Sequence, residues 1–213
     1  MKTSVRDTYL NFDHSNMDFG ILMNAVDEAR LLEEGVFVEF GTGMGVAGRL
    51  IIPHLSGEWF YTVDPYEPYE GNAVGDIDPW EGVNQNMLKG EDFYLKRKED
   101  TVKSLSKIAE TAGCNFIYYD MADYEFIHSS NERFKFVYVD SLHTLNHVQH
   151  LCRIMILHNK IVDGGMLVFD DVSCYDHSVV DEFLIKNNYT KEEEGDFKIS
   201  YRRGLDNAPG FFV

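Results

Sequence analysis

The sequence predicts an α/β fold: a doubly wound, mainly parallel sheet of seven strands with an antiparallel last strand. Short apolar runs rich in Val, Phe and Tyr alternate with longer amphipathic segments, which is typical of βαβ units around a parallel sheet. Several of these runs end directly in Gly or Asp, as strands do before a turn. The 213 residues, 44% of them hydrophobic, predict one domain with a full core.

The first half of the chain contains two strands and three helices. Apolar residues recur at helical spacing before the first strand, and that strand ends in glycines. The second strand closes at Asp64, and a long amphipathic segment further on is stopped by Gly113. The predicted elements are a helix over 18–34, a strand over 36–40, a helix over 45–55, a strand over 59–63 and a helix over 92–112.

The second half supplies the other five strands. The last two alternate polar and apolar residues across Glu194-Gly195-Asp196, which predicts a closing hairpin of antiparallel edge strands. The predicted elements are strands over 115–119, 134–139 and 166–169, helices over 146–160 and 179–187, and closing strands over 189–193 and 198–202.

Residues 65–90 form the longest stretch without a clear period. The stretch is rich in Pro, Gly and acidic residues and is longer than an ordinary strand-to-helix connection. Loops after the carboxyl ends of strands border the ligand crevice of an open parallel sheet. We therefore expect a lid or substrate loop inside the single domain of residues 1–213, with a surface insertion as the alternative.

The chain is strongly acidic, with 19 Lys and Arg against 36 Asp and Glu and a formal net charge of −17. Phosphate backbones and anionic membrane surfaces repel such a protein, so we expect no nucleic acid and no membrane among its partners. The three cysteines form no CxxC pair, and the N-terminal residues lack the apolar stretch of a signal peptide. These features predict a reduced, cytoplasmic location.

A glycine-rich turn follows the first strand. Residues 39–48 read EFGTGMGVAG and contain both an E-x-G-x-G-x-G pattern and a dinucleotide-type G-x-G-x-x-G pattern from Gly43 to Gly48. Glycines let a ligand approach the backbone closely where a strand turns into a helix. Glu39 suits an ammonium group better than a diphosphate, whereas Asp64, 21 residues beyond Gly43, suits the adenosine ribose of either kind of cofactor.

The segment from Glu39 to Gly45 resembles motif I of the class I S-adenosylmethionine-dependent methyltransferases, which have a Rossmann-like fold. Asp64 is similar to the ribose-binding acid of that family, and Asp120 is similar to its adenine-contacting acid. The resemblance implies that S-adenosyl-L-methionine is the cofactor and that it is bound by Glu39, Gly41, Gly43, Gly45, Asp64 and Asp120.

Carboxylates also follow two later strands. Asp140 and Asp170 are 30 residues apart, which is one βαβ repeat, so both should lie at the carboxyl ends of neighbouring parallel strands. Together with Asp171, these carboxylates would repel one another unless a cation or a proton lay between them. Oxygen ligands of this kind suit Mg²⁺ or Mn²⁺ better than zinc. Capping and loop hydrogen bonds made by acids at strand ends are the alternative.

The pattern D-x-x-H at Asp140 and His143, a Gly-Gly turn and the pair Asp170-Asp171 resemble one group of O-methyltransferases. That group includes macrocin O-methyltransferases and cephalosporin hydroxylase-named methyltransferase-like enzymes. The resemblance implies a Mg²⁺ ion held by Asp140, Asp170 and Asp171. It also implies that His143 is the general base, with Asp140 as the second catalytic residue. A solvated loop histidine is the alternative interpretation of His143.

These observations predict a divalent-metal-dependent O-methyltransferase that acts on a small hydroxylated metabolite. Two alternatives stay open: a NAD-type nucleotide-dependent oxidoreductase that uses the Gly43–Gly48 pattern, and a non-catalytic protein that binds S-adenosylmethionine. The sequence does not specify the methyl acceptor, and assembly into a homo-oligomer stays open.

Overall fold

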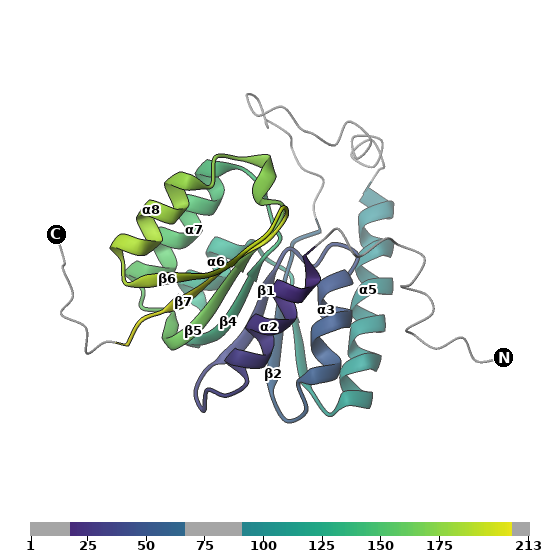
Figure 1. Cartoon of the computed structure of the whole chain (residues 1–213). Helices are drawn as coiled ribbons and strands as arrows, with labels where there is room; N and C mark the ends of the chain where they lie inside the picture. The colour runs from purple at the N-terminus through teal and green to yellow at the C-terminus, as the bar shows by residue number, and fades with distance from the viewer. Residues whose placement is uncertain (1–17, 67–90, 206–213) are drawn as a thin grey trace.

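The computed structural model describes residues 18–66 and 91–205, and within them the chain forms one sheet with helices on both faces (Figure 1). The sheet has seven strands in the order β3-β2-β1-β4-β5-β7-β6. The first five strands along the chain pair in parallel, and β7 is antiparallel to both of its neighbours. The predicted fold class is confirmed.

The strands lie close to their predicted positions. The closing hairpin is antiparallel as predicted, but only β6 is an edge strand, because β7 inserts between β5 and β6. The bounds are β1 (Val36–Phe40), β2 (Trp59–Val63), β3 (Asn115–Tyr119), β4 (Phe134–Val139), β5 (Ile161–Phe169), β6 (Tyr189–Glu194) and β7 (Ile199–Arg203).

The prediction for β5 was too short, because the strand begins at Ile161 and includes the glycine pair that we expected to precede it. Along β4 and β5 the pairing passes from Phe134↔Ile161 to Phe136↔Met166, so β5 carries extra residues in a bulge. A Cβ at Gly165 would lie 2.7 Å from Cγ2 of Ile161. Glycine is needed there for the bulge rather than for a turn.

Helices cover both faces of this sheet. They are α2 (Phe19–Ala29), α3 (Val46–Ile51), the 3-10 helix η2 (Ile52–His54), α5 (Glu91–Ala112), α6 (Asp123–Ser129), α7 (Leu145–Leu157), the 3-10 helix η3 (Val172–Cys174) and α8 (Ser178–Lys186). Among them, α6 was not predicted. The predicted helix over 45–55 is divided into α3 and η2, with Pro53 in the first turn of η2.

Two helices end earlier than predicted. The helix predicted over 18–34 ends at Ala29, and the carbonyl oxygen of Leu32 accepts a hydrogen bond from Nζ of Lys135 at 3.0 Å. The helix predicted over 146–160 ends at Leu157, two residues before Asn159, which has the left-handed φ of +50° that commonly terminates helices.

Each face of the sheet has its own core. Helices α2, α3 and α5 pack on one face, where Leu22, Ile51 and Leu105 are fully buried. Helices α6, α7 and α8 pack on the other face (Figure 1), where Leu151 and Leu184 are fully buried. This two-sided burial explains why the central strands are apolar at nearly every position.

The predicted lid or substrate loop, residues 65–90, lies outside the described residues except for its first two positions. Within the described ranges, none of the helices combines the length and the apolar character that a bilayer crossing requires.

The register of the parallel strands brings their carboxyl ends to one edge of the sheet. The last residue of β1, Phe40, pairs with Val63 of β2 and with Val139 of β4. Val63 in turn pairs with the last residue of β3, and Val139 pairs with the last residue of β5. The residues that directly follow these strands are therefore neighbours at this edge: Gly41, Asp64, Asp120, Asp140 and Asp170.

A buried histidine, His177, lies between η3 and α8 and contacts β7. The ring nitrogens of His177 lie 3.1 Å from the Tyr175 hydroxyl and 2.9 Å from the Tyr201 hydroxyl, which also contacts Asp181. If Tyr201 donates to Asp181, then Nε2 of His177 donates to Tyr201 and Nδ1 accepts from Tyr175, so the ring is neutral. Burial lowers the pKa of His177 to about 4.

We expect His177 to make the fold sensitive to acid. Its pKa is lower in the folded chain than the ordinary value of 6.5. Its contribution to stability is therefore complete above about pH 6.5 and is lost as the pH falls toward 4, by up to roughly 3 kcal/mol. Urea unfolding at about pH 7.5 and about pH 4.5 should show a larger loss for the unmodified chain than for His177→Gln. Equal losses in the two proteins would contradict this expectation.

Candidate active site

The glycine turn after β1 touches the end of β4. Gly41 has a left-handed φ of +88°, and a Cβ at this position would lie only 2.0 Å from the carbonyl oxygen of Asp140. Gly45 is confined by α5 in a similar way, since its Cβ would lie 2.9 Å from Thr101. At Gly43, with φ of +49°, a Cβ would meet no atom of the described residues within 4 Å. Packing within the described ranges thus explains Gly41 and Gly45, and it leaves the space beside the Cα of Gly43 unfilled.

Glu39 lies under this turn and is 1% exposed. Its Oε2 accepts a hydrogen bond from the Thr62 hydroxyl at 2.9 Å, and Thr62 also contacts Thr42. Burial raises the pKa of Glu39 to about 8, although the bond from Thr62 acts in the opposite direction. The carboxyl group is therefore protonated at neutral pH in this state and would ionise beside a cationic group.

Asp64 is tied to the glycine turn by both of its oxygens. The N–H of Gly43 donates to Oδ2 at 2.9 Å and the N–H of Tyr66 donates to Oδ1 at 2.7 Å. The Tyr66 hydroxyl donates to the carbonyl oxygen of Gly43 at 2.7 Å, so this side chain, 8% exposed, lies across the turn. Burial raises the pKa of Asp64. The structure thus places Asp64 beside Gly43.

Asp120 belongs to the same edge but makes different contacts. Its carboxylate forms an ion pair with Lys98 of α5, and its side chain is 55% exposed. The Tyr118 hydroxyl lies 3.0 Å from Oδ1 of Asp120 and 2.5 Å from the carbonyl oxygen of Asp64. Tyr118 thereby connects the two acids for which the sequence predicts contacts with adenosine.

His143 stands between two carboxylates. Its Nε2 lies 3.3 Å from Oδ1 of Asp140, and its Nδ1 lies 3.3 Å from Oδ2 of Asp171. Burial by itself lowers the pKa of His143, but the nearby carboxylates, Asp140 first, outweigh burial and raise it. Burial, followed by the charge of Asp170, raises the pKa of Asp140. These side chains therefore titrate as one coupled group.

The Nε2 atom of His143 has unused hydrogen-bonding capacity. It is shielded from solvent, and it has no aligned hydrogen bond within the described part of the chain, because its contact with Asp140 has ion-pair geometry only. A neutral imidazole nitrogen in this situation can accept a proton from a hydroxyl group placed beside it.

Asp170 is enclosed by donors from the chain itself. Its Oδ1 accepts from Nζ of Lys198 at 2.5 Å and from the N–H of Asp171 at 2.9 Å. Its Oδ2 accepts from the hydroxyl of Tyr138 in the neighbouring strand β4. Both oxygens are therefore engaged, and the Lys198 side chain is fully buried.

The predicted metal ligands do not fit a divalent ion in this arrangement. Asp170 is neutralised by Lys198, and the imidazole of His143 lies between Asp140 and Asp171. Across residues 18–66 and 91–205, no set of three or more His, Cys, Asp or Glu side chains is arranged to hold a metal. Metal dependence stays a prediction.

Sequence reasoning missed several residues that shape the site. Thr62 had a signal, since it is a lone polar residue in the apolar run of β2. Tyr66, Tyr138 and Lys198 had none, because their roles depend on partners far away in the sequence. A further histidine, His147, is held apart from His143 by contacts with Asp123 and Ser141 at 2.8 and 3.1 Å.

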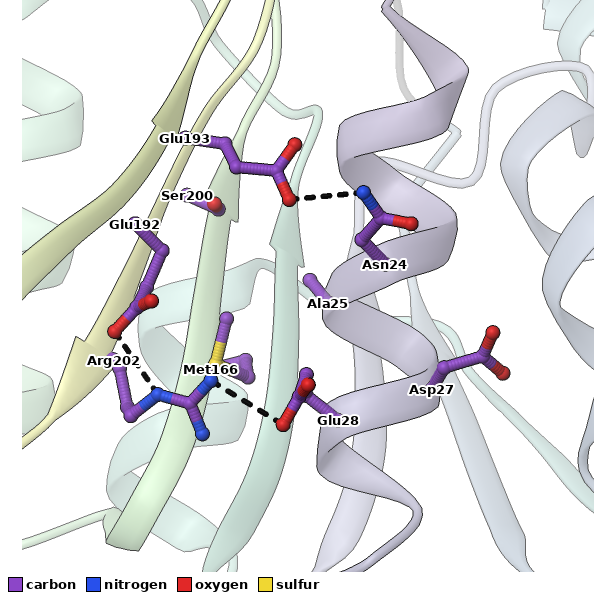
Figure 2. A pocket seen from close by; sticks show the side chains of 9 residues that line it. All are labelled: Asn24, Ala25, Asp27, Glu28, Met166, Glu192, Glu193, Ser200 and Arg202. Carbon is purple, nitrogen blue, oxygen red and sulfur yellow. Dashed lines mark hydrogen bonds and ion pairs between the residues drawn. The ribbon is translucent and has the colours of Figure 1, made fainter.

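A separate pocket of about 270 Å³ lies between α2 and the hairpin β6–β7 (Figure 2). Its charged side chains are largely paired with one another. Arg202 contacts Glu28 at 3.4 Å and Glu192 at 3.0 Å, and Asn24 donates to Glu193 at 2.9 Å. None of the predicted site residues lines this pocket. They lie instead at the carboxyl edge of the sheet, which is therefore the candidate active site.

Comparisons with known proteins give matches only at the level of structure. Neither the models of protein families nor the curated proteins yield a match to this sequence. Among solved structures, a putative caffeoyl-CoA O-methyltransferase from Staphylococcus aureus is 13% identical with a TM-score of 0.56. The match covers 95% of this chain and 94% of that one.

Two further structures extend the likeness. The ribosomal protein L11 methylase from Lactobacillus delbrueckii subsp. bulgaricus is 11% identical with a TM-score of 0.52, covering 91% of this chain and 81% of that one. The O-methyltransferase TomG from Streptomyces achromogenes, in complex with SAM, is 13% identical with a TM-score of 0.52. This match covers 85% of this chain and 78% of that one. At these identities the likeness concerns the fold, and the roles of the site residues stay predictions.

Proposed function

Because the chain has the class I methyltransferase fold, we propose that it is an S-adenosylmethionine-dependent methyltransferase that methylates a hydroxyl oxygen of a small metabolite. One observation carries the proposal: His143, held between Asp140 and Asp171, lies at the strand end that contacts the glycine turn at Gly41. A candidate base and a candidate cofactor site thus share one edge of the sheet.

The cofactor would supply an electrophilic methyl group on a sulfonium. On the protein side, the space beside the Cα of Gly43, where a Cβ would meet no described atom within 4 Å, gives a ligand close approach, and Glu39 can ionise to receive an ammonium group. Asp64 and Asp120, joined through Tyr118, offer acceptors for the ribose and the adenine. The residues present therefore fit the cofactor that the sequence predicts.

On the acceptor side, His143 would remove the proton of the hydroxyl group as its oxygen attacks the methyl group. Asp140 and Asp171 orient the imidazole and stabilise its protonated form, because each faces one ring nitrogen. The net charge of −17 disfavours a nucleic-acid acceptor, so a small hydroxylated metabolite is the acceptor class that we propose.

Isothermal titration with S-adenosylhomocysteine and with NAD(H) tests the cofactor. We expect binding of S-adenosylhomocysteine alone, and tight binding of NAD(H) alone would reject the proposal in favour of an oxidoreductase. Incubation with S-adenosylmethionine and a panel of hydroxylated compounds then tests the reaction. Cofactor binding without transfer to any acceptor would favour a non-catalytic binding protein.

Binding of S-adenosylhomocysteine should also release a proton near neutral pH. The pKa of Glu39 is about 8, so its carboxyl group must ionise to pair with the ligand's ammonium group. Below about pH 8 we therefore expect the affinity for S-adenosylhomocysteine to increase as the pH increases, by up to about tenfold per pH unit. Titration calorimetry in buffers of different ionisation enthalpy measures the released proton directly.

The matched variants for this experiment are Glu39→Gln, which should bind more weakly and release no proton, and Glu33→Gln, an exposed control that should behave like the unmodified chain. Binding without proton release by the unmodified chain would show that Glu39 does not meet the ammonium group.

A further inference from the structure

The carboxylate cluster at the ends of β4 and β5 contains a cation that belongs to the protein. Lys198 has no exposed side-chain surface, and its Nζ lies 2.5 Å from Oδ1 of Asp170. The ammonium group also faces the rings of Phe19 and Tyr138, at 4.8 and 5.8 Å from their centroids. A buried ammonium with this set of partners is held in one place.

The backbone next to Lys198 is anchored as well. Oδ2 of Asp18, which precedes α2, accepts from the N–H of Phe197 at 2.7 Å and from the N–H of Lys198 at 3.4 Å. The two residues that precede β7 are therefore hydrogen-bonded to the residue that precedes α2. These bonds hold the backbone from which the Lys198 side chain extends to the carboxylates.

The contacts of Asp170 extend this arrangement to His143. The N–H of Asp171 donates to Oδ1 of Asp170, the same oxygen that Lys198 contacts. Asp171 has a left-handed φ of +47°, and from this conformation its carboxylate reaches Nδ1 of His143. The position of Asp170 thus determines where the second carboxylate beside His143 lies.

We propose that the Lys198 ammonium is the resident cation of this carboxylate cluster, in the place that the sequence assigns to a divalent metal, and that through Asp170 it positions Asp171 against His143. A divalent ion bound to Oδ1 of Asp170 at the usual ligand distance of ~2.1 Å would stand within about 5 Å of the ammonium nitrogen, and like charges repel at that separation. Lys198 is a positioning residue here, since it does not contact His143.

Titration of the full chain with Mn²⁺ tests the first part. We expect no saturable binding by the unmodified protein, followed by the electron paramagnetic resonance signal of free Mn²⁺. One-to-one binding that disappears in Asp170→Asn would overturn the proposal, because the carboxylates would then hold a metal with Lys198 in place.

The variant Lys198→Met removes the charge and keeps a long apolar side chain. We expect its melting temperature to fall by roughly 10 °C, since Asp170 is left buried without a counterion. Mn²⁺ should bind this variant and restore part of that loss, whereas Lys198→Arg, which keeps the positive charge, should not bind Mn²⁺. A folded Lys198→Met protein that is indifferent to Mn²⁺ would contradict the proposal.

Lys135 offers a matched control. It is also buried, with 2% side-chain exposure, and forms an ion pair with Glu58 at 2.8 Å on the same sheet. Lys135→Met should lose stability as well, but Mn²⁺ should not restore it, because within the described ranges Glu58 is the one carboxylate paired with Lys135. Rescue of both variants by Mn²⁺ would mean a general ionic effect and would overturn the proposal.

The double variant Asp170→Asn with Lys198→Met covers the case in which Lys198→Met does not fold. It removes both buried charges, so we expect it to fold and to bind no Mn²⁺. Mn²⁺ binding by this variant would overturn the role of Asp170.

The inference rests on the proposed function only where it names His143 as the group that is positioned. Its readouts, metal binding and melting temperature, involve no methyl transfer. Failure to bind S-adenosylhomocysteine would therefore remove the proposed function and leave the result on Lys198 standing.

Discussion

Replacing His143 with alanine is expected to lower methyl transfer by roughly 10²–10⁴-fold, which is the usual effect of losing a general base. The hydroxyl group of the acceptor loses its proton as it attacks, and Nε2 of His143 is a buried nitrogen that has no hydrogen-bond partner among the described residues. The affinity for S-adenosylhomocysteine should change little, since the glycine turn and Glu39 are untouched. Single-turnover rates with a labelled methyl donor, measured beside calorimetric affinities, separate the two effects.

His150 provides the control for this substitution. It lies in α7, is exposed, and is close to His143 in the sequence, so His150→Ala should retain the full rate. Asp171→Asn should reduce the rate less than His143→Ala does, because it removes one of the two orienting carboxylates. A rate that survives His143→Ala would remove this residue from the mechanism.

Replacing Gly41 with alanine is expected to destabilise the whole fold. The left-handed φ of +88° costs an alanine about 1–2 kcal/mol, and its Cβ would stand 2.0 Å from the carbonyl oxygen of Asp140. Relief of that clash requires the end of β1 to move away from the end of β4. We expect a total loss of roughly 4 kcal/mol or more, a large part of the ~5–15 kcal/mol that ordinarily holds a domain together. Urea unfolding followed by circular dichroism measures it.

Gly57 separates the two contributions to this loss. Its φ of +82° is nearly the same, but a Cβ there would meet no atom of residues 18–66 and 91–205 within 4 Å. Gly57→Ala should therefore lose only the backbone cost of about 1–2 kcal/mol. Equal losses for the two variants would show that the contact between Gly41 and Asp140 is not tight in solution.

The strands were predictable because apolar runs bounded by Gly and Asp are local signals. Helix ends were harder, since they depend on features such as the left-handed backbone of Asn159 and the hydrogen bond from distant Lys135 to the carbonyl oxygen of Leu32, beyond the end of α2. The short helix α6 was missed, because seven residues with only two fully buried apolar positions, Phe126 and Ile127, carry little periodicity.

In the candidate site, the sequence predicted correctly that Asp64, Asp140 and Asp170 lie at one edge of the sheet, since each directly follows a parallel strand and the register brings those ends together. It did not show how their charges are balanced. His143 reaches both Asp140 and Asp171 only because the left-handed backbone of Asp171 turns its carboxylate toward the imidazole.

The sequence by itself determined the fold class, the glycine turn and the row of acids at one edge of the sheet, because strand periodicity and strand-end residues are local properties of the chain. Only the tertiary structure decided what those acids contact. Lys198 is 28 residues from Asp170 and reaches it because β7 pairs in antiparallel with β5. Electrostatic partners are set by distance in space, and a buried carboxylate accepts whichever cation the fold brings to it.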